Sequence, residues 1–390
     1  MKYAWFKRIV ALTLLSILAT ACGGVATPVV APIVSENMPA EITLGAVHDL
    51  SGATANYGLA IQKGINLAVK QINDQKFLGE GHIVKVIFED TAGDPKKSIA
   101  AYEKLIANKS IVAILGPTLS TEAVAADPIA QKAKMPVVAS SNTVDGIVDI
   151  GDYIFRTSLP ESAVIPNTVK VTVKALNLKQ VAIMYGNDDA YTRGGYQVFK
   201  ESLNNAGIKI LTEETLAKGD TDFSTQLTKI KSLNPDAIIV VALAEEAANI
   251  MLQARTLGIP DSVHIIGGNS FNSPKLAQIA GKSAEGAISG SAWNASSVFP
   301  ASAEFVKAFT AEYNAAPDQF AAQAYVAAWV VAVAVKNANS ADHAAVRDAL
   351  AQVKNFDTPL GKYSFDEKRN PVHEPVVLII KDGNFVVYQP

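Results

Sequence analysis

Cysteine occurs only once in this chain of 390 residues, at Cys22, which excludes an internal disulfide. Histidine is almost as rare, with five scattered copies, and the sequence offers no evident cluster of metal ligands. The nucleotide-binding fingerprint G-x-G-x-x-G and the zinc-protease motif H-E-x-x-H are absent as well. Gly281-Lys282-Ser283 matches the end of a P-loop, but Leu276 stands where that motif requires its first glycine. We therefore expect neither a cofactor nor a metal.

Charge is sparse and nearly balanced. Asp, Glu, Lys and Arg make up 18% of the residues, and 34 basic against 37 acidic side chains leave a net charge of −3 without a basic tract. No nucleic-acid partner is expected, because binding to phosphates needs a basic surface. The hydrophobic content of 49% indicates a folded globular protein. Because single cores rarely grow beyond about 250–300 residues, a chain of 390 residues has room for two.

The N-terminal residues have the composition of a secretory signal peptide, which we place at residues 1–21. Lys2, Lys7 and Arg8 supply its positive start, and residues 9–21 form an apolar stretch too short for an ordinary membrane span. Beyond this segment the sequence has no apolar run long enough to cross a bilayer. The mature protein is therefore expected outside the cytoplasm.

Cys22 follows Leu18-Ala19-Thr20-Ala21, and this segment resembles the signals of bacterial lipoproteins, in which the cysteine after the cleavage site is lipidated. The leucine usual three residues before the cysteine is displaced by one, with Ala19 in its place. The alternative is ordinary cleavage that leaves an unmodified thiol. Residues 22–40, rich in Gly, Pro and small side chains, are expected to form the lipid anchor and a tether. The protein would then lie on the outer face of the cytoplasmic membrane, or otherwise in the periplasm.

Two series of alternating strands and helices follow the tether. Apolar, β-branched runs predict strands at 42–47, 84–88, 111–115 and 137–139, with helices at 57–72, 95–108 and 120–134. A second series predicts strands at 181–185, 208–212, 237–243 and 264–266, with helices at 191–205, 223–233 and 245–257. No hairpin signal interrupts the first series, so its sheet should be parallel with right-handed crossovers.

The pattern changes from residue 301 onward. Three helices are predicted at 301–313, 320–337 and 341–353, followed by strands at 360–365 and 376–388. Asp382-Gly383-Asn384 is a hairpin-type turn and is expected to extend one sheet at its edge. The whole pattern predicts an α/β protein with two doubly wound parallel-sheet lobes and a cleft between them.

A candidate binding surface lies between the strands at 111–115 and 137–139. Each strand is followed by a hydroxyl-rich loop, Leu119-Ser120 in the first case and Ser140-Ser141-Asn142-Thr143 in the second. In open α/β sheets, small ligands bind at this carboxyl edge. Ser120 is predicted as the N-cap of the next helix, whose first N–H groups suit an anion.

Several short motifs occur in a specific order after the tether: Leu50-Ser51-Gly52, Gly116-Pro117 with Ser120, Phe155-Arg156-Thr157, Pro235-Asp236-Ala237 and Phe365-Asp366. On these motifs and their spacing, the chain resembles the bacterial substrate-binding lipoproteins and periplasmic proteins of branched-chain-amino-acid ABC transporters. The resemblance implies the type I periplasmic-binding-protein fold, with two lobes joined by three hinge crossings. It assigns residues 41–160 plus 291–373 to lobe one and 161–290 plus 374–390 to lobe two.

The same resemblance implies a function without catalysis. Members capture a small molecule in the cleft and close by hinge motion, which presents a distinct surface to an ABC permease in the membrane. For this chain we expect a monomer that binds an amino acid or a related small carboxylate or amide. A ligand-sensing lipoprotein of the same fold is one alternative, and a hydrolase acting in the cleft is an alternative of another class.

The resemblance also assigns site residues in lobe one. The family holds the ligand's carboxylate and ammonium with two loops, which by position are Leu119, Ser120, Ser140, Ser141 and Asn142. Ser120 at a helix start can offer a hydroxyl and backbone N–H groups to a carboxylate, or it can serve only its own helix. Asn142 stands where threonine is common in relatives, and it can instead be a plain turn residue.

Two tyrosines are further candidates. Tyr57 corresponds to a tyrosine that lies near the cleft in relatives, although a tyrosine packed in the core is the alternative. Tyr191 follows a strand of the second series and can cover the ligand from the other lobe. Its neighbours Asp188, Asp189 and Arg193 can equally form a solvated cap and ion pair.

Asn269 departs from the family pattern, because relatives often place an acid there to pair with the ligand's ammonium. A buried ammonium without a charged partner costs several kcal/mol, and an Asn carbonyl supplies a hydrogen bond but no charge. Either another acid such as Asp188 or Asp189 serves the ammonium, or the ligand lacks one. We lean to a carboxylate or amide ligand that need not be leucine, isoleucine or valine. The nearby Phe271 can line the pocket or anchor its loop.

Overall fold

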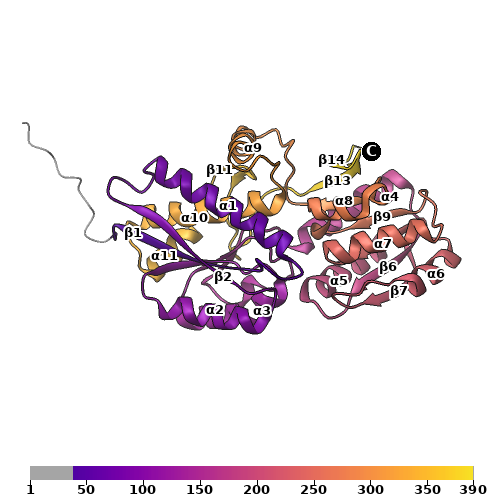
Figure 1. Ribbon diagram of the computed structural model, residues 1–390, viewed down its shortest axis with the longest axis horizontal. Coiled ribbons are helices and arrows are strands. Elements are labelled where there is room, and N and C mark those ends of the chain that lie inside the picture. Colours follow the sequence, from indigo (N-terminus) through magenta and orange to yellow (C-terminus); the bar gives the residue numbers. More distant parts are fainter. Residues whose placement is uncertain (1–37, 390) are drawn as a thin grey trace, which may run out of the picture. The chain divides into compact units, whose positions relative to one another are not determined.

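The computed structural model describes residues 38–389, so the predicted signal peptide, Cys22 and most of the tether lie outside the described residues. Two large β-sheets organise the described part, and we name each sheet with its helices the first and the second lobe (Figure 1). The prediction of two α/β lobes is confirmed.

The first lobe is built on a five-stranded sheet with the order β2-β1-β3-β4-β5, and every neighbouring pair is parallel. Its strands are β1 (Glu41–His48), β2 (Ile83–Asp90), β3 (Ile111–Leu115), β4 (Val137–Ala139) and β5 (Ile154–Arg156). β3 is buried along its whole length, as its unbroken apolar sequence predicts for a strand covered on both faces. The first four strands are confirmed, whereas the sequence prediction assigned no element to β5.

Six helices surround this sheet. The crossovers carry α1 (Ala55–Asp74), α2 (Pro95–Ala107) and α3 (Ser120–Ala133), and the later part of the chain adds α9 (Pro300–Tyr313), α10 (Gln319–Ala338) and α11 (His343–Ala351). α10 lies alongside α1 (Figure 1). Gly64 of α1 permits this close approach, because a Cβ there would overlap the backbone oxygen of Ala321. Contrary to the sequence expectation, α10 is long and apolar enough to cross a membrane, but 83% of its most apolar stretch is buried inside the lobe, as in a core helix.

The second lobe contains a seven-stranded sheet with the order β14-β13-β10-β9-β8-β6-β7. Five strands run parallel: β6 (Gln180–Gly186), β7 (Lys209–Leu216), β8 (Ala237–Val241), β9 (His264–Gly267) and β10 (Ile288–Ser291). Its helices are α4 (Glu161–Leu176), α5 (Ala190–Asn205), α6 (Ser224–Leu233), α7 (Ala244–Thr256) and α8 (Pro274–Ala280). α8 and β10 were not foreseen from the sequence.

A hairpin completes the second sheet at one edge. β13 (Val376–Lys381) pairs antiparallel with β10, and β14 (Asn384–Val387) pairs antiparallel with β13. Asp382 and Gly383 connect the two strands with φ angles of 51° and 73°, a conformation suited to a tight hairpin turn. The predicted edge extension is confirmed.

Three details of the sequence prediction are wrong or incomplete. The single strand expected at 360–365 is instead a small hairpin of β11 (Phe356–Thr358) and β12 (Gly361–Tyr363). No element was predicted for α4, because Pro166 and many β-branched residues give it a low helix propensity. Packing compensates, since one face of α4 is buried in the second lobe. The N-cap of α3 is Leu119 rather than Ser120, which is the first helical residue.

The chain passes between the two sheets three times. It leaves the first sheet after β5, returns to the first lobe after β10, and leaves it again after β12 to form β13. The three crossings bring segments distant in sequence to the same place between the lobes. The exact lobe boundaries given above stay a prediction.

Candidate ligand-binding site

A cavity lies where the loops after β3 and β4 face loops of the second lobe. Its empty space amounts to about 420 Å³ when the open mouth is included. The side chains that line it carry hydroxyl, amide, aromatic and aliphatic groups. Within the part of the chain that the structure describes, no lining side chain is charged. They are Tyr57, Thr118, Leu119, Ser120, Ser141, Thr143, Tyr191, Leu243, Asn269, Ser270, Gln319, Phe320 and Gln323.

The two loops of the first lobe are joined by hydrogen bonds that set the direction of their hydroxyls. Ser141 Oγ donates to the backbone oxygen of Thr118 at 2.7 Å, so its lone pairs can accept from a ligand. Ser120 Oγ accepts from the backbone N–H groups of Thr143 at 3.2 Å and Val144 at 3.4 Å, so its own hydrogen remains available to a ligand. The pair therefore offers one donor and one acceptor to a head group.

The remaining predicted residues of this lobe divide into two groups. Leu119 lines the cavity. Ser140 and Asn142 are buried but are not among the lining residues. Asn142 Nδ2 donates to the backbone oxygens of Pro117 at 3.1 Å and Thr118 at 3.2 Å, which holds the first loop in place. Thr143, which the sequence analysis did not single out, lines the cavity beside Ser141.

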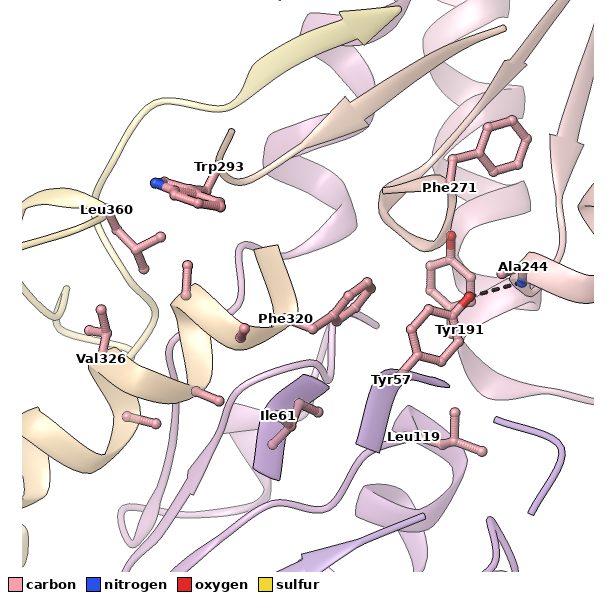
Figure 2. Close-up of a cluster of buried hydrophobic side chains, with 14 of the residues drawn as sticks. Tyr57, Ile61, Leu119, Tyr191, Ala244, Phe271, Trp293, Phe320, Val326 and Leu360 are labelled. Carbon is pink, nitrogen blue, oxygen red and sulfur yellow. Dashed lines mark hydrogen bonds between the residues drawn. The ribbon is translucent and has the colours of Figure 1, made fainter. Parts of the chain in front are cut away.

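Tyr57 links the lobes across the cavity (Figure 2). Its hydroxyl donates to the backbone oxygen of Ser270 at 3.1 Å and accepts from the backbone N–H of Ala244 at 2.8 Å. Burial raises the pKa of this phenol, so it remains a neutral donor and acceptor. The Tyr57 ring packs against Phe320, with centroids 4.7 Å apart, and both rings line the cavity.

Tyr191 reaches the same loop from within the second lobe. At the start of α5, its hydroxyl donates to Ser270 Oγ at 2.9 Å and accepts from the backbone N–H of Ser270 at 3.3 Å. Ser270 Oγ donates in turn to the backbone oxygen of Ala242 at 2.7 Å. Ser270, unforeseen from the sequence, is thus the residue on which Tyr57 and Tyr191 meet.

Asn269 lines the cavity from η2 (Asn269–Phe271), a short 3-10 turn after β9. Its Nδ2 donates to Glu161 Oε1 at 3.0 Å, and its backbone oxygen accepts from Gln319 Nε2 at 2.7 Å. Phe271 does not line the cavity. Its ring is fully buried against Gly267 and anchors the turn in the second lobe (Figure 2).

Glu161, the first residue of α4, is the acid nearest this site and was not foreseen from the sequence. It is not itself among the lining residues but contacts two of them, Asn269 and Thr143. Its side chain is buried, and Oε2 has no hydrogen-bond partner among the described residues. Burial raises the pKa of this carboxyl from 4.5 to about 7, against smaller lowering by Asn269 and Thr143. Only its position after Phe155-Arg156-Thr157, at the first chain crossing, hinted at a role.

The acids considered from the sequence are engaged elsewhere. Asp188 accepts from the backbone N–H of Lys218 at 3.1 Å. Asp189 caps α5 through Thr192 N–H at 3.1 Å and accepts from Thr121 Oγ1 at 2.6 Å, which is a second link between the lobes. Neither side chain is among the residues that line the cavity.

His48, which precedes Asp49 in the sequence, contacts Thr118, one of the residues that line the cavity. His48 Nδ1 lies 3.1 Å from Thr118 Oγ1, and burial lowers the pKa of the imidazole to about 3, so the ring is neutral. Asp49 accepts from the backbone N–H groups of Gly52 and Thr54 and shapes the turn before α1. Within residues 38–389, no group of three His, Cys, Asp or Glu side chains is arranged to hold a metal ion.

Comparisons with known proteins agree with this architecture. A family model described as periplasmic binding protein matches residues 41–383. The Leu/Ile/Val-binding protein BraC3 of Rhizobium johnstonii is 29% identical over 333 residues, covering 84% of this chain and 88% of that protein.

Two solved structures are similar over most of their length. The branched-chain amino acid transporter substrate-binding protein LivJ of Streptococcus pneumoniae, in complex with isoleucine, has a TM-score of 0.83 and 31% identity, covering 90% of this chain and 100% of that one. A solute-binding protein of an ABC transporter from Rhodopseudomonas palustris BisB5, in complex with 3,4-dihydroxybenzoic acid, has a TM-score of 0.81 and 26% identity, covering 90% and 97%.

Proposed function

The chain belongs to the periplasmic binding protein family, among the substrate-binding proteins of branched-chain-amino-acid-type ABC transporters, and we propose that it captures an amino acid or a related small carboxylate or amide for import. This family is a class of extracytoplasmic solute-binding proteins rather than enzymes. The observation that carries the proposal is the cavity itself, which is closed by polar side chains from both lobes and contains no charged lining residue among those described.

The first lobe offers a site for a carboxylate. Ser120 has a hydroxyl hydrogen to donate, because its oxygen already accepts two backbone hydrogen bonds. It stands at the start of α3, where the helix dipole favours a negative group. A ligand carboxylate at this point gains charge-assisted hydrogen bonds without burying a second fixed charge.

The remaining walls suit a compact, largely apolar side chain. Tyr57 and Phe320 form an aromatic surface, with Leu119 and Leu243 also lining the cavity. This mixture of apolar walls and hydroxyl groups suits an amino acid or a small aromatic acid. Both ligand classes occur among the structural neighbours, because one is in complex with the amino acid isoleucine and another with the aromatic acid 3,4-dihydroxybenzoic acid.

Delivery by hinge closure is the next part of the proposal. The hydrogen bonds from Tyr57 to Ser270, from Thr121 to Asp189 and from Gln319 to Asn269 all cross between the lobes. Opening must break them, so a ligand that bridges both walls shifts the population toward the closed form. We infer that the closed form is what an ABC permease recognises, with Cys22 as lipid attachment point and the protein acting as a monomer.

A thermal-shift screen of amino acids, short amides and aromatic acids tests the proposal, followed by calorimetry on the hits. A ligand at a hundredfold excess over its Kd stabilises the protein by about 2.7 kcal/mol, which is readily measured. We expect one-to-one binding, weakened about tenfold or more by Ser120→Ala and unchanged by the same substitution at exposed Ser232. Absence of binding in every class, or turnover of the bound compound, would contradict the proposal.

A further inference from the structure

We propose that Glu161, held by Asn269, forms a subsite for a ligand ammonium, so that the ligand carries a protonated amine as well as a carboxylate. This inference rests on the proposed function and specifies the chemical class of its ligand. Relatives often place an acid at the position of Asn269 to pair with the ligand's ammonium. In this chain the negative charge would come instead from Glu161, which lies behind Asn269.

The geometry places the Glu161 carboxyl directly behind the cavity wall. Oε1 accepts from Asn269 Nδ2 at 3.0 Å, and the Glu161 backbone N–H donates to the backbone oxygen of Thr143 at 2.9 Å. Asn269 and Thr143 both line the cavity. The second oxygen, Oε2, is buried, without a hydrogen-bond partner among the described residues, and lies 3.4 Å from where a Cβ would stand on Gly268.

An unpartnered buried carboxyl oxygen is costly unless something binds to it, since buried polar atoms are nearly always hydrogen-bonded. An ammonium would supply both the missing hydrogen bond and a compensating charge. The lone pairs of Ser141 Oγ, which donates its own hydrogen to Thr118, can accept a further hydrogen bond from the ligand. No described lining side chain is charged, so Glu161 is the candidate that balances a cationic head group.

Charged groups and burial around Glu161 together set the pKa of its carboxyl. The negative charge of Asp145 raises the pKa of the Glu161 carboxyl, and the positive charge of Arg156 lowers it. The nearby Tyr191 phenol is neutral, because burial raises its pKa. The Arg156 guanidinium makes its hydrogen bonds to Asn370 Oδ1 and to the backbone oxygens of Asn142 and Val144, not to Glu161. Burial outweighs these groups and raises the pKa of the Glu161 carboxyl to about 7.

The proton balance follows from this environment. Without ligand below about pH 7, the carboxyl is mostly protonated and neutral. An ammonium favours the carboxylate, so its arrival transfers the proton from Oε2 to solvent, up to one per ligand. Above that pH the carboxyl is already ionised and little proton is released. The affinity for an amine-bearing ligand should therefore fall about tenfold between about pH 8 and about pH 6.

Calorimetry with matched probes tests the inference. The amine-bearing probes are L-leucine, L-isoleucine and L-valine, and their amine-free counterparts are 4-methylpentanoate, 3-methylpentanoate and 3-methylbutanoate. Each is titrated near neutral pH in two buffers of different ionisation enthalpy, which measures proton release directly. We expect an amino acid to bind with release of a substantial fraction of a proton, and the amine-free acids to release none.

Glu161→Gln keeps the shape of the protonated side chain and should fold, which its melting temperature verifies. It should weaken amino-acid binding at least tenfold, abolish proton release and leave any binding of amine-free acids unchanged. Glu103→Gln, at an exposed position on α2, is the control for loss of one negative charge and should behave as wild type. Glu161→Asp, which keeps the charge, should retain proton release.

Three results would overturn the inference. They are an unaltered amino-acid affinity in Glu161→Gln, a wild-type protein that binds amine-free acids alone, and no binding of any of the six probes. The first two leave the proposed function intact, because a small carboxylate is still captured. In the third case the proposed function fails only if the wider screen is empty as well. Amino-acid binding without proton release would overturn the proton exchange.

Discussion

The hydroxyl of Tyr57, in the first lobe, accepts a hydrogen bond from the backbone N–H of Ala244, in the second lobe, at 2.8 Å (Figure 2). Ala244 is the first residue of α7, and its N–H group has no hydrogen-bond partner within the helix. The Tyr57 hydroxyl accepts the hydrogen bond from this group. The same hydroxyl donates to Ser270. One side chain therefore makes two contacts that exist only while the lobes are together.

Tyr57→Phe should weaken ligand binding by favouring the open form. The substitution removes both hydrogen bonds, worth together about 1–3 kcal/mol, and keeps the ring packed on Phe320. We expect the affinity to fall about fivefold to a hundredfold, with faster ligand dissociation, as measured by calorimetry and stopped-flow fluorescence. Tyr313→Phe, which removes the bond from that hydroxyl to the Lys63 backbone oxygen within the first lobe, is the control. An unchanged affinity in Tyr57→Phe would show that these bonds do not hold the lobes together.

Asn269→Asp should extend amino-acid binding to lower pH. The new carboxyl would lie 3.0 Å from Glu161, and two acids this close share one proton. The pair therefore keeps one negative charge at about pH 6, where Glu161 alone is mostly protonated, so the affinity of the variant should exceed that of the wild type at this pH. Calorimetry from about pH 6 to about pH 9 measures the difference. A variant affinity at about pH 6 no higher than that of the wild type would contradict this account of Asn269.

Asn269→Leu distinguishes positioning from contact with the ligand. It removes the donor that favours the ionised form of Glu161, so the pH midpoint of amino-acid affinity should move upward. At high pH, where Glu161 is ionised in either protein, most of the amino-acid affinity should return. A loss that is equal at every pH would mean that Asn269 binds the ligand directly rather than through Glu161.

Gly64→Ala should destabilise the protein. Alanine normally stabilises a helix by about 1 kcal/mol relative to glycine, but here its Cβ would overlap the backbone oxygen of Ala321 on the buried helix α10. Overpacking of this kind costs about 1–3 kcal/mol, which outweighs the helical gain. Urea denaturation measures the difference. Asn66→Ala, on the exposed face of the same helix, is the control and should be neutral or slightly stabilising.

Asp127→Asn should make stability less sensitive to pH. Asp127 is buried in α3 and accepts from Tyr102 Oη at 2.9 Å, and burial raises the pKa of its carboxyl from 3.8 to about 8. The folded state therefore binds a proton that the unfolded state releases, and the stability from this group is lost as pH rises from about 4 to about 8. Melting temperatures of wild type and variant should diverge with increasing pH. Parallel curves would show that Asp127 does not carry this dependence.

Much of the fold was readable from the sequence because its strands are short apolar runs with clear boundaries. β3 and β8 are buried along their whole length, and their composition alone identifies them. α4 escaped prediction because the burial of one face, rather than local propensity, makes it helical. The three- and four-residue strands β5 and β10 depend on neighbours in the sheet, which a local pattern does not contain.

The sequence predicted those site residues that directly follow a predicted strand. Ser120 and Ser141 line the cavity together because parallel strands end at one sheet edge. Of the adjacent residues Ser140, Ser141 and Asn142, only Ser141 is among the residues that line the cavity, and a loop sequence does not specify which side chain faces a ligand. Gln319 and Phe320 reach the cavity because α10 packs on α1, and Glu161 lies behind the cavity wall because α4 starts at a crossing. Such contacts arise from tertiary packing.

The turn η2 has a consequence for how such a protein can change its ligand. Asn269 and Ser270 face the cavity, while Phe271, the last residue of the turn, is anchored in the second lobe. Asn269 and Ser270 share the second-lobe wall of the pocket with Tyr191 and Leu243, and they occupy adjacent positions beside an aromatic anchor. Substitutions at these two positions therefore change the pocket lining, as the engineering of a biosensor requires, while both sheets and the hinge crossings keep their sequence.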